Sequence, residues 1–242
     1  MPPPPPQFIY CRGPSEGKNG DGRADGRVTN VHFSDAELIG PIPPELLLLT
    51  ELRELDLDGS FFSGPIPEFV GTGWPSLAEL DLSFNALTGG IPSSLGESDA
   101  SHRIQELELH HNELSGPLPP AIGLMPRLRE LELGANAFTG SVPREWVALG
   151  DTLSAFEIHD NIIFGPLYPL ASARSLMRTA VHFNEGLCGA VPGPVRWAEG
   201  FNPAGTGLGT PCAGEDLWWL PRGKSGVGSE ALVSGAKVEG GK

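Results

Sequence analysis

The side chains of this chain that could do chemistry are mostly carboxylates, and nine of them recur at regular intervals in two sets. The sets stand one residue before and one residue after a repeated leucine or phenylalanine: Glu54, Glu79, Glu106 and Glu130, and Asp56, Asp81, Glu108, Glu132 and Glu157. Carboxylates gathered on one surface attract a basic partner or cations. They can equally be the water-facing side chains of a repeated element, and both interpretations stay open.

Histidines are the second group with chemical potential, because neutral imidazole binds transition metals. Two of the six, His110 and His159, occupy equivalent positions two repeats apart, with Gly134 at the position between them. Two strand spacings amount to about 10 Å, which is too far for one small metal ion to bridge. We therefore expect His110 and the adjacent His111 to be solvated, and we predict neither a metal site nor a cofactor.

A repeated element must position these residues. Successive copies are 24, 25, 27, 24 and 25 residues apart, counted from the apolar residue two before a repeated glycine: Leu38, Phe62, Leu87, Leu114, Phe138 and Ile163. Such a period predicts a stacked solenoid, not a globule around one central core. Within one copy, Leu80 and Leu82 alternate with Glu79, Asp81 and Ser83. This alternation predicts a short strand with buried leucines and outward polar residues.

Each expected strand is followed by residues that suit a turn. An asparagine can satisfy backbone groups that the turn leaves unpaired. A glycine permits the next bend, and a proline keeps the following segment extended. The asparagines are Asn85, Asn112, Asn136 and Asn161. The longest step between copies contains residues 96–103, where we expect an extra loop.

The shared pattern LxxLxLxxNxLxGxIP resembles the plant-type, extracellular class of leucine-rich repeat, whose mark is the Gly-x-Ile-Pro end seen at 40–43, 64–67 and 89–92. Receptor ectodomains and polygalacturonase inhibitors have similar repeats. The resemblance implies an α/β-type repeat solenoid, an arc of about six to seven repeats. Short parallel strands would line its concave face, and its convex side would be irregular or 3-10 helical. We expect an N-terminal cap remnant rich in Pro and Gly, leucine-rich repeats, a degenerate last repeat with a C-terminal cap, and a disordered tail, at residues 1–26, 27–172, 173–213 and 214–242.

Three cysteines bear on the compartment of the protein: Cys11, Cys188 and Cys212. Residues 183–192 and 205–212 resemble the C-terminal cap of secreted members of that family, which implies a Cys188–Cys212 disulfide. Cys11 matches the second cysteine of the family's N-terminal pair, but the first cysteine is absent, as is a signal peptide. We interpret the chain as a fragment of an extracellular or cell-surface protein, or alternatively as a cytoplasmic protein with reduced thiols.

Composition excludes several classes of function. The net charge of −14 argues against nucleic-acid binding, which needs a basic surface. No apolar run approaches 18 residues, so we predict no membrane span. The sequence contains no Gly-rich phosphate loop, kinase signature or GxSxG motif, so we do not predict an enzyme.

These features favour a non-catalytic recognition module that binds a protein or peptide on its concave face. The partner would be basic if the acidic surface is used, and we expect the chain to be a monomer. The predicted contact residues are Glu54, Asp56, Glu79, Asp81, Phe84, Glu106, Glu108, His110, His111, Glu130, Glu132, Glu157, His159 and Asp160. The alternatives are an inhibitor of a secreted polysaccharide hydrolase, a truncated receptor-kinase ectodomain that acts in signalling, and an intracellular scaffold.

Overall fold

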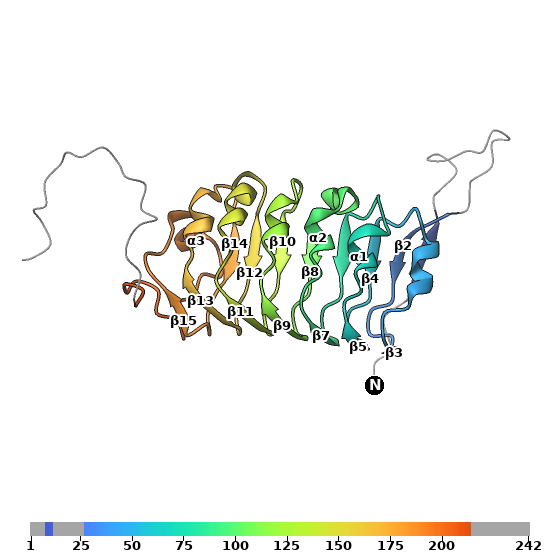
Figure 1. Cartoon of the computed structure of the whole chain (residues 1–242), viewed down its shortest axis with the longest axis horizontal. Coiled ribbons are helices and arrows are strands. Elements are labelled where there is room, and N and C mark those ends of the chain that lie inside the picture. Colours follow the sequence, from blue (N-terminus) through green and yellow to red (C-terminus); the bar gives the residue numbers. More distant parts are fainter. Residues whose placement is uncertain (1–7, 12–26, 214–242) are drawn as a thin grey trace, which may run out of the picture. The chain divides into compact units, whose positions relative to one another are not determined.

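The computed structural model describes residues 8–11 and 27–213, in which the chain winds through successive coils of similar construction. Each coil contributes one strand to a first sheet and one strand to a second sheet. In Figure 1 the strands of the first sheet follow one another in chain order from β2 to β14. The predicted repeat solenoid is therefore confirmed, whereas the predicted tail at 214–242 lies outside the described residues.

The first sheet has eight strands, of which β1 pairs antiparallel with β2 and the others run parallel. In the order of the sheet they are β1 Phe8–Cys11, β2 Val28–His32, β4 Glu54–Asp56, β6 Glu79–Asp81, β8 Glu106–Glu108, β10 Glu130–Glu132, β12 Ala155–Glu157 and β14 Arg178–Ala180. Their middle residues, such as Leu80 and Leu107, are buried, as the alternating pattern predicts.

The second sheet has seven parallel strands, which Figure 1 shows along the lower side of the coils. They are β3 Ile39–Gly40, β5 Phe61–Pro65, β7 Ala86–Gly89, β9 Glu113–Pro117, β11 Ala137–Gly140, β13 Ile162–Pro166 and β15 Gly186–Cys188. The sequence predicts extended chain here but not a sheet. The sheet forms because each coil bends at an equivalent glycine with positive φ, such as Gly89 at 78° and Gly140 at 81°, which aligns extended neighbours.

Short helices complete the coils. Within the described residues three are α-helical, α1 Phe69–Thr72, α2 Ser94–Glu97 and α3 Gly193–Trp197. Five are 3-10 helices, η1 Pro44–Leu48, η2 Asp99–Arg103, η3 Pro120–Leu124, η4 Arg144–Asp151 and η5 Tyr168–Ser172. The α2 and η2 helices occupy the longest step between repeats, where the sequence predicts an extra loop.

One hydrophobic core runs through the coils and is built from equivalent leucines, isoleucines and phenylalanines. Its polar counterpart is a ladder of asparagines at the turns. Asn136 accepts a hydrogen bond from Leu114 N at 2.9 Å and donates to three carbonyl oxygens, including Leu109 O at 3.0 Å. Four further asparagines lie at equivalent positions, and each bonds to backbone groups of the preceding coil: Asn85, Asn112, Asn161 and Asn184. The asparagines therefore stitch neighbouring coils together.

The prediction that Ser83 faces outward with Glu79 and Asp81 is wrong. Strand β6 ends at Asp81, and Ser83 is only 2 % exposed within the turn that follows. Its amide donates to Asp81 Oδ1 at 2.8 Å, and its carbonyl accepts from Gly59 N and Asn85 Nδ2. The backbone has left the strand by this point, so the alternation of the strand no longer applies.

Candidate functional site

The predicted carboxylates lie side by side because neighbouring strands of the first sheet are paired in register. One column is formed by residues that pair in register from strand to strand: Asn30, Glu54, Glu79, Glu106, Glu130, Ala155 and Arg178. The next column is formed by His32, Asp56, Asp81, Glu108, Glu132, Glu157 and Ala180. Adjacent strands are about 4.8 Å apart, so each column is a ladder of neighbouring side chains.

The acidic half of this surface contains a hollow of about 130 Å³ across β2 to β8. Leu55 and Leu80 contribute apolar surface to it, and the other lining residues are ionisable: His32, Glu54, Asp56, Glu79, Asp81, Glu106 and Glu108. His32 lies at its end and pairs with Glu54 at 3.2 Å and with Asp56 at 3.4 Å. We call these nine residues the acidic hollow. It offers a cationic group several carboxylates at once.

Burial and mutual repulsion hold protons on part of this surface. Burial, followed by the charges of Asp81 and Glu132, raises the pKa of Glu108 to about 8. Burial also raises the pKa of Glu79, and neighbouring carboxylates on both sides add to the rise. Asp58, which the sequence did not single out, has a pKa of about 6, mainly because it is partly buried beside Asp56. A cation in the acidic hollow would relieve this repulsion.

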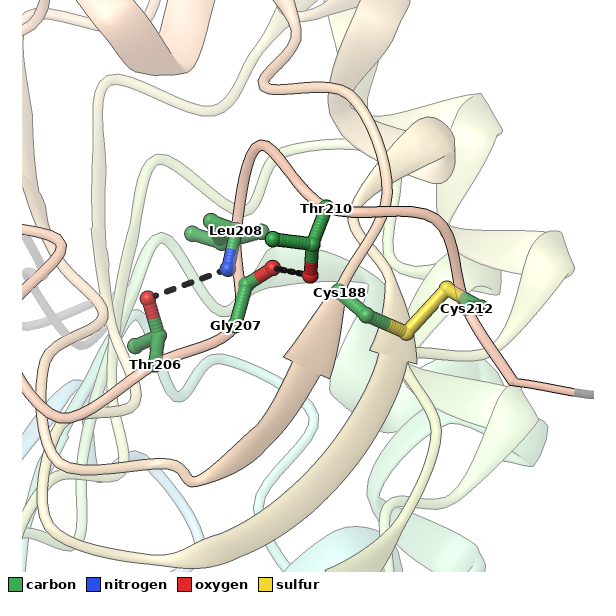
Figure 2. The surroundings of a disulfide bond; sticks show 6 residues. All are labelled: Cys188, Thr206, Gly207, Leu208, Thr210 and Cys212. Carbon is green, nitrogen blue, oxygen red and sulfur yellow. Dashed lines mark hydrogen bonds between the residues drawn. A yellow bond between two sulfur atoms is a disulfide. The ribbon is translucent and has the colours of Figure 1, made fainter.

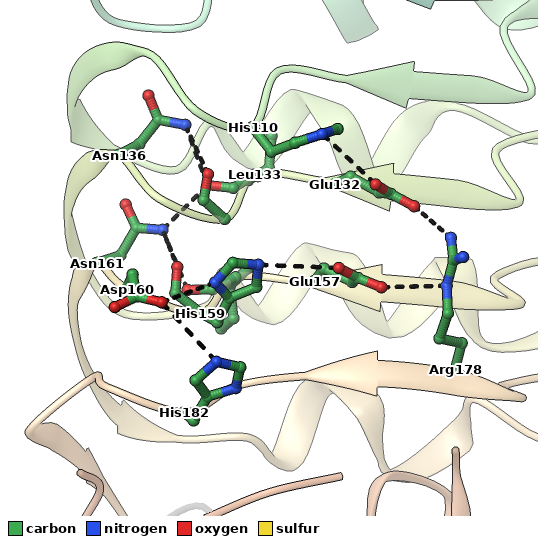
Figure 3. Close-up of polar contacts among 12 residues, drawn as sticks. His110, Glu132, Leu133, Asn136, Glu157, His159, Asp160, Asn161, Arg178 and His182 are labelled. Atoms are coloured by element: carbon green, nitrogen blue, oxygen red, sulfur yellow. Dashed lines mark hydrogen bonds and ion pairs between the residues drawn. The ribbon is translucent and has the colours of Figure 1, made fainter. Parts of the chain in front are cut away.

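In the other half of these columns, the carboxylates of β10 and β12 are partly compensated by one arginine that the sequence analysis missed. Figure 3 shows Arg178 of β14 reaching across to the carboxylates of β10 and β12. It pairs with Glu130 at 3.3 Å, with Glu157 at 3.1 Å and also with Glu132. The carboxylates that Arg178 does not contact are therefore concentrated at the acidic hollow.

A second arginine, Arg129, directly precedes β10. It lowers the pKa of Glu106, although burial and Glu130 raise that pKa by more. Arg129 also lines a wider hollow of about 840 Å³ with Arg127, Arg174 and Asp151. That hollow is lined by several arginines and so differs in charge from the acidic hollow.

Aromatic and imidazole rings continue the surface beyond the carboxylate columns. His110 is half-buried beside Glu132 at 3.5 Å, and burial lowers its pKa to about 4, with smaller contributions from nearby cationic groups. Phe84 stacks on His111, with ring centroids 4.4 Å apart. His111 is exposed as predicted, whereas His110 is not. Phe84, His111 and Asp160 share a left-handed backbone conformation, which turns all three toward the same edge.

His159 has a neighbour that the sequence analysis overlooked. The sequence analysis compared His159 only with His110, which is two repeats away. His182 lies one strand away from His159, and the rings of His159 and His182 are parallel with centroids 4.8 Å apart. Asp160 lies against both rings, as Figure 3 shows. The signal was present, because Arg178, Ala180 and His182 repeat the outward spacing of the earlier strands.

The C-terminal end of the coil is closed by the predicted disulfide between Cys188 and Cys212, which is confirmed. The two Cα atoms are 5.1 Å apart, and the bond closes a separation of 24 residues (Figure 2). The segment before Cys212 follows the edge of β15: Gly189 N donates to Thr210 O, and Gly207 N donates to Leu187 O. The last coil is thus held by both covalent and backbone bonds.

Known proteins share this repeat and this coil. The family model described as Leucine Rich Repeat matches residues 76–98 and 103–125. Pollen receptor-like kinase 2 of Arabidopsis thaliana is 34% identical over 119 residues, which are 49% of this chain and 18% of that protein. The chain contains leucine-rich repeats of the plant type. Its repeats therefore belong to the class that the Gly-x-Ile-Pro ends indicate.

Solved structures resemble this leucine-rich repeat protein along most of its coils. A pollen receptor kinase 3 structure has a TM-score of 0.62 and 28% identity, covering 75% of this chain and 80% of that one. The ectodomain of the Arabidopsis receptor kinase HAESA, solved in complex with an N-terminally extended IDA peptide hormone ligand, has a TM-score of 0.65 and 26% identity. That match covers 77% of this chain and 36% of the HAESA chain.

The leucine-rich repeat protein spans only a small part of its curated relatives, 18% of Pollen receptor-like kinase 2 and 14% of Receptor-like protein 35. Within the part of the chain that the structure describes, no helix has the length and apolar character needed to cross a membrane. The confirmed disulfide and the receptor-like relatives agree with an extracellular or cell-surface setting.

Proposed function

We propose that this chain is a non-catalytic recognition module, part of an extracellular receptor-like protein, that binds a basic peptide or a basic segment of a protein on its first sheet. The observation that carries the proposal is the acidic hollow, where carboxyl groups such as Glu108 and Glu79 have raised pKa values. A cationic side chain that enters the hollow exchanges repulsion between carboxylates for attraction to them. The HAESA structure with its peptide hormone supports peptide binding as the mode of recognition.

The proposed ligand would lie mainly against β4, β6 and β8. Arg178 already compensates the carboxylates of β10 and β12, so a lysine or arginine of the ligand gains less there. The stacked pair of Phe84 and His111 stands at the edge of the same strands and offers an apolar contact beside the charges. A peptide with a basic residue next to an apolar one fits this arrangement.

A panned peptide library tests the proposal. A phage-displayed random library selected on the purified chain should enrich peptides that contain lysine or arginine. The Kd of one selected peptide is then measured by fluorescence anisotropy for the wild type and for the double variant Asp81→Asn, Glu108→Gln. The measurement is made at pH 9, above the pKa of about 8 of Glu108, so that the double variant lacks two charges. At about 0.5–1 kcal/mol for each lost charge, the Kd should rise by about tenfold at low salt.

A matched control separates this effect from net charge. The double variant Glu68→Gln, Glu113→Gln also removes two charges, but both of these side chains are exposed outside the first sheet. Its Kd should stay close to that of the wild type. Enrichment of acidic peptides, or equal losses of affinity in the two double variants, would contradict the proposal.

A further inference from the structure

Three potential metal ligands converge at the far end of the first sheet from the acidic hollow. His159 Nδ1 lies 2.9 Å from Asp160 Oδ2, and His182 Nε2 lies 3.8 Å from the same oxygen. One donor atom from each residue can be chosen so that all lie within 4.8 Å of one another. Figure 3 shows Asp160 between the two imidazole rings, at the ends of neighbouring turns.

These separations are close to those of a coordinated ion. Zinc binds imidazole nitrogen and carboxylate oxygen at about 2.0–2.2 Å, so neighbouring ligand atoms of a tetrahedral site are roughly 3.3–3.6 Å apart. The His159–Asp160 distance of 2.9 Å must lengthen by about half an ångström, and the Asp160–His182 distance of 3.8 Å must shorten by a few tenths of an ångström. The parallel rings require one further change, because an ion lies in the plane of each ring that binds it. A turn of the His182 ring about its Cβ–Cγ bond provides this, and its side chain is 24% exposed.

The donor set selects a class of metal. Two imidazole nitrogens and one carboxylate oxygen suit Zn²⁺, Cu²⁺ and similar ions, whereas Ca²⁺ and Mg²⁺ prefer sites made of oxygen. From His159, Asp160 and His182 we infer a binding site for a divalent transition-metal ion, with Zn²⁺ as the expected occupant. The remaining coordination positions face solvent on the same surface, where water or a donor atom of a bound partner can fill them.

The surroundings hold His159 in the orientation that this site needs. Its Nδ1 atom faces Asp160 Oδ2 at 2.9 Å, and its Nε2 atom lies 3.9 Å from Glu157 Oε2, slightly beyond hydrogen-bond distance. Arg178 holds that carboxylate through its Nε atom at 3.1 Å. A carboxylate behind a metal-binding histidine fixes the tautomer and the ring orientation.

Gly134 makes room for the ring. It occupies the position of His159 on the preceding coil, and an added Cβ atom there would lie 2.3 Å from His159 Nε2. Any side chain at this position would therefore displace the imidazole. The φ angle of Gly134 is outside the left-handed region, so an alanine is compatible with the backbone and would act on the ring alone.

The test is a zinc titration of the full 242-residue chain without an affinity tag. All proteins carry Cys11→Ser, because a thiol is itself a strong zinc ligand. Isothermal titration calorimetry gives the Kd for Zn²⁺, and the visible spectrum of added Co²⁺ reports nitrogen and oxygen ligands directly. His159→Gln and His182→Gln should each raise the Kd by more than about tenfold and remove the Co²⁺ band. Thermal unfolding in EDTA checks that each variant is folded.

Two further variants sharpen the result. Gly134→Ala, which removes no ligand, should also weaken zinc binding, whereas the matched control His102→Gln should leave the Kd unchanged. The inference is overturned if the wild type shows no zinc binding tighter than about 0.1 mM, which would be weak for such a donor set. It is also overturned if the His159 and His182 variants bind as the wild type does, or if His110→Gln abolishes binding while His182→Gln does not. These readouts do not depend on a peptide ligand, so the peptide proposal can fail while this one holds.

Discussion

Replacement of Glu108 by glutamine should stabilise the fold at high pH and have little effect at low pH. The pKa of Glu108 rises from its ordinary value of 4.5 to about 8 because the folded state buries it among Asp81, Glu132 and other carboxylates. The folded state therefore binds the proton more tightly than the unfolded state. This contribution to stability is fully present below about pH 4.5 and is lost as the pH rises toward 8.

The magnitude follows from the same pKa. The full difference would correspond to about 5 kcal/mol at about 1.4 kcal/mol per pKa unit. Glu108 is only half-buried, so solvent screening reduces the expected effect to about 1–2 kcal/mol. Glu108→Gln removes the charge but keeps the shape. The variant should exceed the wild type in free energy of unfolding by about this amount at pH 9, and match it within about 0.5 kcal/mol at pH 4.5.

Urea unfolding followed by circular dichroism at both pH values measures the difference. The control is Glu113→Gln, since Glu113 is exposed on β9 of the second sheet and should show no such dependence on pH. Added salt should reduce the gain at pH 9, because part of it comes from repulsion between carboxylates. An equal gain at pH 4.5 and pH 9, or a loss of stability at pH 9, would refute the reasoning.

Other predictions concern the forces that hold the coils together. Asn136→Ala removes four hydrogen bonds to the backbone and should lower the free energy of unfolding by about 2–4 kcal/mol in urea titrations; a loss below about 0.5 kcal/mol would contradict the proposed role of the ladder. Leu107→Ala leaves a cavity in a fully buried position and should cost about 2–5 kcal/mol by the same assay, unless neighbouring coils collapse into the space. Cys188→Ser opens the disulfide to Cys212 and should cost about 3 kcal/mol; an unchanged midpoint of thermal unfolding would show that backbone bonds alone hold the last coil.

The period of the sequence predicts the solenoid, because the same apolar positions recur and no single copy can bury them. It also predicts which side chains line the first sheet, since alternation within a strand has only two faces. The second sheet was missed because its strands carry no alternation: segments such as 61–65 and 113–117 are extended by glycine and proline chemistry. Only the stacking of coils shows that these segments pair.

The sequence analysis missed Arg178 as a counter-ion of the carboxylates because the leucine pattern ends before β14. In β14 the buried middle position is Thr179, which is 0% exposed but is not an apolar residue. The strand therefore lacks the usual pattern, and Arg178 and His182 were not aligned with the earlier outward positions. The Arg178 side chain reaches across two strands to Glu130, and His182 lies against Asp160 of the neighbouring turn. Sequence spacing alone does not specify how far a side chain reaches.

The antiparallel pairing of β1 with β2 has a consequence for assembly. A sheet of parallel coils has an open strand at its end, and such an edge can template the addition of another chain. Phe8–Cys11 occupies the backbone groups of β2 that would otherwise be available for this. At the opposite end, Glu199 bonds to both Met177 and Thr179 beside β14. The first sheet thus ends on one side in a four-residue antiparallel strand with an irregular register between Tyr10 and Cys11, and on the other side beside the backbone of Glu199. Short and irregular edges disfavour strand addition, which leaves the broad face of the sheet as the surface available for recognition.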